Sequence, residues 1–317
     1  MINHQSIHGF KVGDTVHSHY LLKSIQDKQT KTNKPYVQIV LQDQSGTIQA
    51  NIWNTTSTDI PLQAGELAYV EALVSDYRQT ITLTNLQLKP QQDPNLQPSL
   101  FREAIPEPAT QLADELLTYV NQITNSVWRQ IVQTILGDTW EAFLVAPAAK
   151  ANHHALESGL LYHTVSMLRL ATSISAQYGS LNRELLYAGI VLHDLAKTIE
   201  LSGTTDIQYT DRGLLIGHIS LIDQKIAITA HTLAIPDDDP SLILLHHMVL
   251  SHHGRQEYGS PVTPHIREAE VLHFIDMLDA HIMMMDTALA KINPGEWTPS
   301  LFAMDGRKFY RSIDPQN

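Results

Sequence analysis

The sequence predicts a multidomain protein in which an N-terminal all-β barrel is followed by a mainly α-helical domain. At 317 residues the chain is long enough for two domains. Residues 1–90 are rich in β-branched and aromatic residues with partial alternation, whereas apolar residues beyond residue 108 recur at helical spacings. Charge divides at the same place: residues 1–90 carry 7 Lys and Arg against 7 Asp and Glu, so the whole net charge of −12 lies beyond them.

Five short strands, separated by turn-forming segments, are expected within residues 1–90. They are Thr15–Ile25, Pro35–Leu41, Gly46–Trp53, Leu67–Val74 and Thr80–Leu88. Five strands joined by tight turns favour a small closed barrel, because closure leaves no sheet edge exposed. We expect a five-stranded OB-type (oligonucleotide/oligosaccharide-binding) barrel, with an SH3-like barrel as the alternative. The segment DQSGTIQANIWN, Asp43–Asn54, resembles the turn and third strand of nucleic-acid-binding OB-folds.

The rest of the chain divides into four parts. Residues 91–108 form a proline-rich linker, 109–150 connecting helices, 151–293 a histidine-rich helical domain and 294–317 a C-terminal tail. The expected helices are Thr110–Ile123, Val127–Leu136, Glu157–Gln177, Asn182–Ile199, Ile219–Leu233, Ser241–His252 and Ile266–Ala290. Thr204–Leu215 interrupts this pattern, and we expect a small hairpin there, with Ile207–Tyr209 and Leu214–Leu215 around a turn.

Composition excludes several classes of protein. The chain has no cysteine, which excludes structural disulfides, Cys-ligated zinc, iron–sulfur clusters and thiol nucleophiles. No apolar run approaches the roughly 20 residues that span a bilayer, and the first ten residues lack the regions of a signal peptide. We therefore expect a soluble, cytoplasmic protein with no membrane partner. The acidic total also argues against coating duplex DNA by charge alone.

Histidines concentrate in the predicted helical domain. Of 17 histidines, 13 fall between His153 and His281. His193 and Asp194 are adjacent within the otherwise apolar stretch Leu185–Glu200. Burying an imidazole and a carboxylate side by side is costly unless they are paired or share a cation. This pair therefore predicts a metal site.

Two further helices each present a ligand-type residue on an apolar stripe. His163 shares a face with apolar neighbours three before and four after it. Asp276 shares a face of its own helix with Leu272, Asp279 and Met283. A set of two histidines and two aspartates suits Mn²⁺, Mg²⁺, Fe²⁺ or Zn²⁺ and leaves positions open for water and substrate. Asp279, one turn beyond Asp276, is either the alternative last ligand or a carboxylate that orients a ligand.

More donors follow along the chain and predict a second ion, so one or two cations are expected. If Asp194 bridges, His218, His252 and His253 complete a second cation site of the kind used for phosphate ester displacement. Lys197 lies one turn after His193, from where it would reach a scissile phosphate and offset developing charge. Asp194, Lys197 and His218 are therefore the candidate catalytic residues.

These residues resemble the signature of the HD-domain metal-dependent phosphohydrolases. The resemblance rests on His163, HDLAK (His193–Lys197), YTDRGLLIGHI (Tyr209–Ile219), SHHG (Ser251–Gly254) and EAEVLHFIDMLDA (Glu268–Ala280). An OB-fold ahead of an HD domain is similar to one subgroup, the YhaM-type 3′→5′ exoribonucleases. The resemblance implies a cation-dependent, often Mn²⁺-stimulated nuclease that acts on single-stranded RNA and in some members on single-stranded DNA.

An alternative activity comes from HHGRQEYGSP, His252–Pro261. This segment distantly resembles HD-type cyclic-dinucleotide phosphodiesterases, although its ending departs from their Gly-Tyr-Pro. The alternative function is therefore a nucleotide or cyclic-dinucleotide phosphohydrolase whose barrel serves regulation or assembly. A nonenzymatic nucleotide sensor is a third reading.

Basic and aromatic residues are the candidates for gripping a strand. Aromatic rings that stack on bases beside a basic groove are how OB-folds hold single strands. The candidates are Lys31, Lys34, Tyr36 and Trp53 in the barrel and Arg255 in the helical domain, with Lys28, Tyr69, Tyr77 and Arg267 as weaker ones. Met283–Met285 predicts helix packing or a contact within a homo-oligomer.

Overall fold

The protein was examined as a computed structural model. It describes residues 4–77, 80–91, 93, 96, 101, 105–149, 156–203 and 207–313. The chain forms two compact units, residues 1–104 and 105–317, which are described separately. Most of the predicted linker at 91–108, and His153 and His154, lie outside the described residues.

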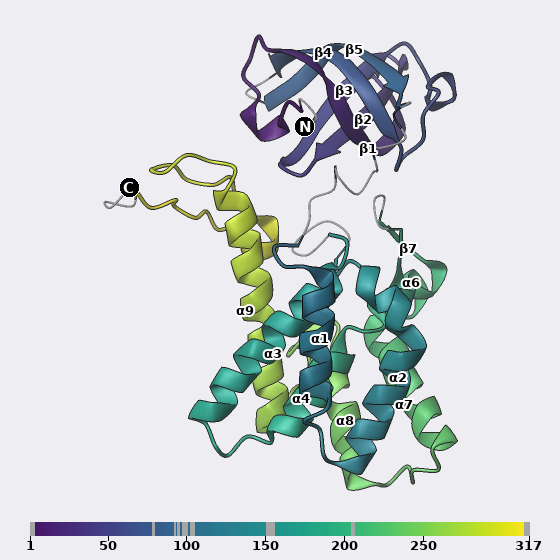
Figure 1. Cartoon of the computed structure of the whole chain (residues 1–317), viewed down its shortest axis with the longest axis vertical. Coiled ribbons are helices and arrows are strands. Elements are labelled where there is room, and N and C mark those ends of the chain that lie inside the picture. The colour runs from purple at the N-terminus through teal and green to yellow at the C-terminus, as the bar shows by residue number, and fades with distance from the viewer. Residues whose placement is uncertain are drawn as a thin grey trace. The chain divides into compact units, whose positions relative to one another are not determined.

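The first unit is a closed five-stranded barrel (Figure 1). Its strands are β1 (Thr15–Gln29), β2 (Pro35–Asp43), β3 (Gly46–Trp53), β4 (Leu67–Tyr77) and β5 (Thr80–Pro90). They follow the order β1-β2-β3-β5-β4, and β1 pairs antiparallel with both β2 and β4. A parallel contact between β3 and β5 closes the barrel. This order is that of an OB-fold, which confirms the predicted barrel and all five predicted strands.

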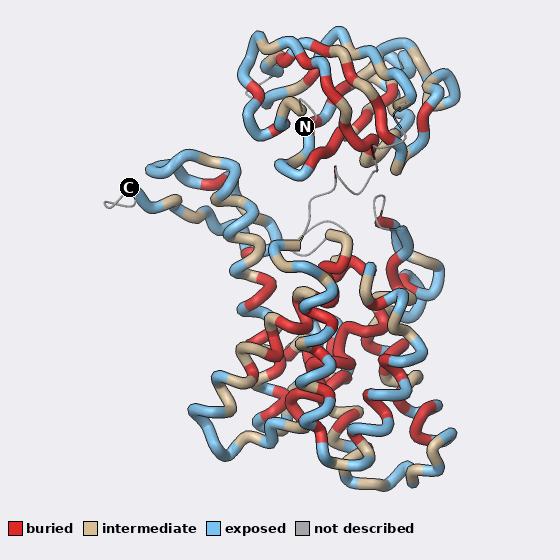
Figure 2. Tube along the Cα trace, in the orientation of Figure 1, coloured by how far each residue is buried: buried red, intermediate tan, exposed pale blue. Residues whose placement is uncertain are grey.

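Alternation of buried residues explains why these segments form strands. Along β2, every second residue from Val37 to Leu41 is fully buried, so Val37, Ile39 and Leu41 share one face of the strand. Figure 2 marks the buried positions of the strands in red. β1 pairs with β4 through Thr15–Leu21 and with β2 through Leu21–Gln29. Its register with β2 shifts between Leu22 and Ser24. Such an irregularity bends a strand, which lets β1 turn the corner of the barrel.

The second unit is a bundle of helices around one apolar core (Figures 1 and 2). Its longer helices are α1 (Ala109–Val120), α2 (Ser126–Val145), α3 (Gly159–Gln177), α4 (Arg183–His193), α7 (His218–Thr232), α8 (Pro240–Ser251) and α9 (Arg267–Leu289). Residues of α1 and α2 belong to the same core as those of α3, α4 and α9. Every residue from Leu185 to Ala196 is buried, as expected for a helix that is apolar all round.

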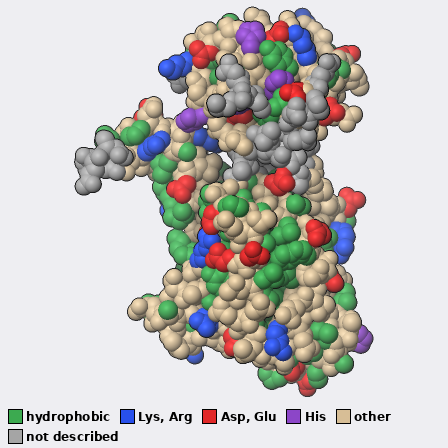
Figure 3. Space-filling model, in the orientation of Figure 1, with side chains coloured by type: hydrophobic (Ala, Val, Ile, Leu, Met, Phe, Trp, Pro, Cys, Tyr) green, Lys and Arg blue, Asp and Glu red, His purple; other side chains and the backbone are tan. Residues whose placement is uncertain are grey.

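Ion pairs tie the start of this unit to its core helices. The guanidinium of Arg169 on α3 donates to Glu107 ahead of α1 and to Glu115 within α1, at 2.6–2.9 Å. Acidic, basic and apolar side chains lie next to one another on the face of this unit that Figure 3 presents. Among the described residues, no helix is both long and apolar enough to cross a membrane.

The prediction of one helix over Asn182–Ile199 was wrong. α4 ends at His193, Asp194 adopts φ −107° and ψ 0°, and a short α5 (Lys197–Glu200) follows. Adjacent side chains on a continuous helix point about 100° apart and do not face each other. The break at Asp194 lets both side chains of the pair turn toward one place.

The predicted hairpin within Thr204–Leu215 was also wrong in its pairing. β7 (Gln208–Tyr209) pairs with β6 (Leu201–Ser202), and α6 (Asp211–Leu215) contains the two leucines. The cause is Thr210, whose hydroxyl accepts a hydrogen bond from Gly213 N and starts the helix.

Candidate metal centre

Seven predicted ligand residues meet in the helical unit from five places in the chain. They are His163 on α3, His193 and Asp194 at the end of α4, Asp276 on α9, His218 at the start of α7, and His252 and His253 after α8. The histidines lie at helix ends except for His163, so the caps of α4, α7 and α8 are aimed at a common point. The residues that the sequence predicts as ligands therefore form one cluster in the folded chain.

The carboxylate of Asp194 lies between two groups of ligands. Its Oδ2 is 3.4 Å from His193 Nε2 and 3.9 Å from His163 Nε2. Its Oδ1 is 3.4 Å from His218 Nε2 and 3.8 Å from His252 Nε2. One oxygen thus faces each group, which is the geometry that a bridging ligand requires.

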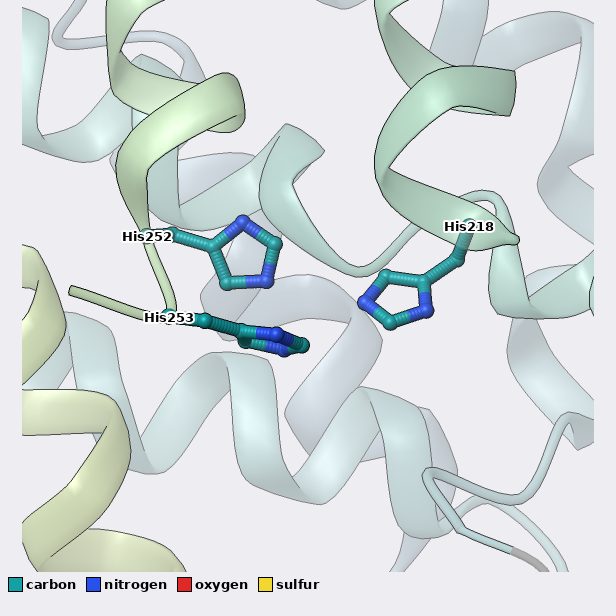
Figure 4. Close-up of side chains that lie close together, drawn as sticks. All are labelled: His218, His252 and His253. Atoms are coloured by element: carbon teal, nitrogen blue, oxygen red, sulfur yellow. The ribbon is translucent and has the colours of Figure 1, made fainter. Parts of the chain in front are cut away.

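We define two ligand groups from these contacts. The first ligand group is His163, His193, Asp194 and Asp276, in which Asp276 Oδ1 lies 3.2 Å from His163 Nε2. The second ligand group is His218, His252 and His253, whose rings converge in Figure 4. Within the trio His163, His193 and Asp194, and within the second ligand group, the ligand atoms all lie within 4.8 Å of one another.

The donor atoms of the cluster fit a divalent cation in their burial, spacing and chemistry. His193 Nε2, Asp194 Oδ1, His218 Nε2 and His252 Nε2 are buried atoms without a hydrogen-bond partner. Such atoms are costly unless something satisfies them. Ligands held about 2.1 Å from one cation lie about 3.0–3.4 Å apart, close to the spacings around Asp194. A set of imidazoles and carboxylates is also the chemistry that Mn²⁺, Fe²⁺ and Zn²⁺ accept.

The Nδ1 atom of each histidine in the cluster already has a hydrogen-bond partner in the protein. His193, His252 and His253 donate from Nδ1 to the carbonyl oxygens of residues 190, 249 and 258, at 2.7–2.8 Å. His163 and His218 instead face carboxylates, as described below. Because a carbonyl can only accept, the proton must lie on Nδ1, and the Nε2 lone pair is left for a metal.

Two carboxylates orient the remaining histidines. Asp279 Oδ2 lies 2.7 Å from His163 Nδ1, and its Oδ1 accepts a hydrogen bond from the hydroxyl of Ser166. Glu200 lies 3.1 Å from His218 Nδ1. Asp276 and Asp279 therefore contact opposite nitrogens of one ring, with Asp276 on the side of the cluster. Sequence reasoning left these two aspartates open, and it missed Glu200.

Lysine 197 is committed to the central carboxylate. Its Nζ donates to Asp194 Oδ2 at 2.6 Å, and its side chain is largely buried. Burial opposes the charge of Asp194, but Lys197 and His193 outweigh that effect and hold the pKa of the carboxyl well below its usual range. Asp194 is therefore an anion at neutral pH, as a bridging ligand must be.

Electrostatics differ between the two ligand groups. Burial would lower the pKa of His163, yet hydrogen bonds with Asp276 and Asp279 outweigh it and raise that pKa to about 10. Burial and neighbouring histidines lower the pKa of His252 well below its ordinary value. Without a metal, the first ligand group holds a proton at neutral pH, whereas His252 is neutral.

The loop that carries the second ligand group depends on a glycine. Gly254 has a φ of +76°, and a Cβ there would lie 2.4 Å from the ring of His273. His273 Nδ1 is 3.1 Å from the carbonyl oxygen of His252. The close packing of this ring explains why a glycine follows the two histidines, and it is a contact that the sequence pattern did not reveal.

The predicted strand-binding residues occupy exposed positions, except for Tyr36, which is partly buried. Tyr36 and Trp53 pair across β2 and β3, with ring centroids 4.8 Å apart and Trp53 57% exposed. Lys31 and Lys34 are exposed in the turn between β1 and β2. In the helical unit, the Arg255 guanidinium lies 5.9 Å from the ring centroid of Tyr258.

Comparisons with known proteins identify the family. The HD domain family matches residues 160–281, the segment from α3 to α9 that contains all seven candidate ligands. The 3′-5′ exoribonucleases YhaM of Bacillus licheniformis and Listeria welshimeri are each 40% identical to this chain. Their alignments cover 96% and 95% of it, and 96% of each relative. The YhaM of Bacillus subtilis is 39% identical over 95% of the chain.

A solved structure also resembles the barrel. The second OB-fold domain of replication protein A from Methanococcus maripaludis covers 27% of this chain and 93% of its own, with 16% identity and a TM-score of 0.22. The fold assignment of the barrel rests on its strand order. From the near full-length similarity to the curated relatives, the chain belongs to the YhaM family of 3′-5′ exoribonucleases.

Proposed function

We propose that this chain hydrolyses phosphodiester bonds of single-stranded RNA from the 3′ end, with divalent cations held by the two ligand groups. The observation that carries the proposal is the convergence of three histidine Nε2 atoms, those of His193, His218 and His252, on the two oxygens of Asp194. These three atoms and Asp194 Oδ1 are buried without hydrogen-bond partners. The name of the relatives, 3′-5′ exoribonuclease, supports the substrate and the direction.

Each residue of the centre has a role that follows from its contacts. His163, His193, Asp194 and Asp276 would hold one cation, and His218, His252 and His253 the other. Bound divalent cations supply Lewis acidity that activates water and offsets charge on a phosphate. Asp279 orients His163 through Nδ1, and Lys197 keeps Asp194 ionised. The chain itself needs no nucleophilic side chain.

Several features of the function are proposed in less detail. Mn²⁺ is the cation we favour over Mg²⁺, Fe²⁺ and Zn²⁺, because the mixed nitrogen and oxygen donors suit it. Single-stranded DNA as a second substrate, a homo-oligomeric state and a cytoplasmic location remain predictions from the sequence.

The barrel supplies a platform for unpaired bases. Tyr36 and Trp53 form an aromatic pair in which Trp53 is exposed and Tyr36 is partly buried, and Lys31 and Lys34 lie in the turn that leads into the strand of Tyr36. Stacking on such rings is tolerant of sequence, because every base has a π-face. We propose that this platform binds the RNA strand while the helical unit hydrolyses it.

The test is digestion of single-stranded RNA labelled at its 5′ end, with Mn²⁺ present. A ladder of progressively shortened labelled fragments is expected, since removal from the 3′ end leaves the label in place. Cleavage of mononucleotides or cyclic dinucleotides without any RNA ladder would support the alternative phosphohydrolase. Binding of RNA with no hydrolysis of any substrate would support the sensor.

A variant pair links that activity to the centre. His193→Ala and Asp194→Ala should each abolish the ladder. The matched control is His231→Ala, because His231 is an exposed histidine on α7 outside both ligand groups. Full activity in either of the first two variants would refute the site assignment.

A further inference from the structure

Two of the five clustered histidines are oriented by carboxylates, one in each ligand group. Asp279 serves His163 in the first ligand group, and Glu200 serves His218 in the second. The other three histidines use main-chain carbonyls. A carboxylate behind a ligating imidazole fixes its tautomer and raises its basicity, so each group contains one strengthened ligand.

Glu200 does more than touch the His218 ring. Its Oε1 also accepts a hydrogen bond from the His218 backbone N at 3.2 Å. His218 is the first residue of α7, and the preceding cap residue is Gly217, which has no side chain to offer the helix. Glu200 therefore replaces a conventional N-cap and fixes the main chain of His218 as well as its ring.

The position of Glu200 is itself fixed by the segment between α5 and α7. Its carbonyl oxygen accepts from Thr210 N at 2.9 Å, and Leu201 pairs with Tyr209. A Cβ on Gly213 would lie 2.3 Å from that carbonyl oxygen and 2.9 Å from Glu200 Cγ. Any side chain at Gly213 must displace Glu200 or α6. The glycine in the YTDRGLLIGHI segment thus has a specific steric role.

Glu200 is also separated from the cluster by the ring that it holds. Its contacts are with His218 N and Nδ1, on the opposite side of the imidazole from Nε2. His218 Nε2 is the buried atom that faces Asp194 Oδ1 at 3.4 Å. Glu200 acts on the cluster through His218 and is 8% exposed, so solvent does not substitute for it.

We propose that Glu200 is a positioning residue that fixes His218 and thereby sets the affinity of the second ligand group for its cation. This inference rests on the proposed function, since it presumes that the two ligand groups bind divalent cations. It assigns the short α5–α6 segment a role in loading the second cation and predicts no effect of Glu200 on the first.

The test is a calorimetric Mn²⁺ titration of the metal-free full chain without RNA. The wild type should bind two Mn²⁺ per chain. Glu200→Gln keeps the size of the side chain and removes its charge, and it should weaken one of the two sites about 10- to 100-fold while leaving the other unchanged. Glu141→Gln, on the exposed face of α2, is the matched control and should bind as the wild type does.

Two further measurements separate positioning from general damage. Gly213→Ala leaves the charge of Glu200 intact but forces a displacement, so it should weaken the same site. In RNA digestion, the activity of Glu200→Gln should be low at limiting Mn²⁺ and return when Mn²⁺ is raised by about 10- to 100-fold. A fall that excess Mn²⁺ does not reverse would overturn the proposal.

The outcomes distinguish the two levels of inference. A wild-type chain that binds no Mn²⁺ refutes the proposed function. A wild type that binds two, with Glu200→Gln unchanged at both sites, refutes only the role of Glu200. Loss of both sites in Glu200→Gln would also refute it, because the residue would then support the fold and not one site. Unchanged affinity at the site still bound shows that the variant is folded.

Discussion

The two ligand groups that share Asp194 differ in charge and burial. The first contains two carboxylates, and its trio His163, His193 and Asp194 is buried throughout. The second consists of three histidines, of which His218 and His253 are partly exposed. A site with more carboxylates and less access to solvent is expected to hold a cation more tightly than a site of histidines with access to solvent. If both groups bind cations, the second cation would be the one nearer to incoming substrate.

The largest effect is expected where the two groups meet. Asp194→Asn keeps the shape of the side chain but removes the charge that both groups share. Both cation sites should weaken, and RNA hydrolysis should fall by about 10³-fold or more, since cation activation of water is lost. Asp276→Asn should weaken only the first site. Both affinities are measured by Mn²⁺ titration. If Asp276→Asn weakens both sites as Asp194→Asn does, the division into two groups is contradicted.

A substitution in the loop after α8 should damage the second group alone. Gly254→Ala places a Cβ against the His273 ring in a backbone conformation that favours glycine. His252 and His253 must shift, so activity should fall about 10- to 100-fold, with one Mn²⁺ site retained. Gly65→Ala is the comparison variant, since its φ is +94° but no neighbour lies within 4 Å of a Cβ there, and it lies in the barrel unit. If Gly65→Ala has as large an effect, the His273 contact is not the cause.

Proton release should also separate the groups. Without metal, His163 has a pKa of about 10 and is protonated at pH 7, whereas burial keeps His252 neutral. A cation at the first site must displace that proton, so its affinity should rise about tenfold per pH unit below pH 10. In the second site, His252 is already neutral and should release no proton when a cation binds. Titration calorimetry in buffers of different ionisation enthalpy measures how many protons are released when Mn²⁺ binds. Binding of Mn²⁺ without any proton release would contradict this prediction.

The smallest effect is expected from the barrel. Trp53→Ala removes the exposed ring of the pair and should cost about 1–3 kcal/mol of binding free energy for single-stranded RNA. Both Mn²⁺ sites and the turnover of saturating RNA should be unchanged. Trp297, an exposed tryptophan that pairs with Tyr310 outside the barrel, provides the control Trp297→Ala. Binding is measured by fluorescence anisotropy with Mn²⁺ omitted, and a similar loss from both variants would argue against a specific platform.

The barrel and the clustering of the candidate ligands were predictable from the sequence, but the detailed arrangement of these residues was only partly so. Periodicity of two identified every strand, and the adjacent His193 and Asp194 indicated a shared cation. The break after His193 was not predicted, because the apolar pattern continues through it. An apolar pattern predicts which residues are buried, and the buried stretch Leu185–Ala196 includes both the end of α4 and the turn that follows it.

The contacts that orient the ligands were beyond sequence reasoning for a different reason. Glu200 and His218 are separated by 17 intervening residues, and their contact depends on how α6 packs against α5. The sequence held one partial signal, which is Gly217 at the start of α7. A glycine has no side chain to cap the helix, so the free backbone N–H groups there require an acceptor from elsewhere. Finding which acceptor it is required the fold.

The central claim is that one carboxylate joins two cation sites. The most direct measurement is a crystal structure of the full chain grown with Mn²⁺, with anomalous difference density recorded at a wavelength where manganese scatters. The account predicts two peaks about 3.5–4 Å apart, one beside each oxygen of Asp194. A single peak, or two peaks of which one lies away from Asp194, would contradict it.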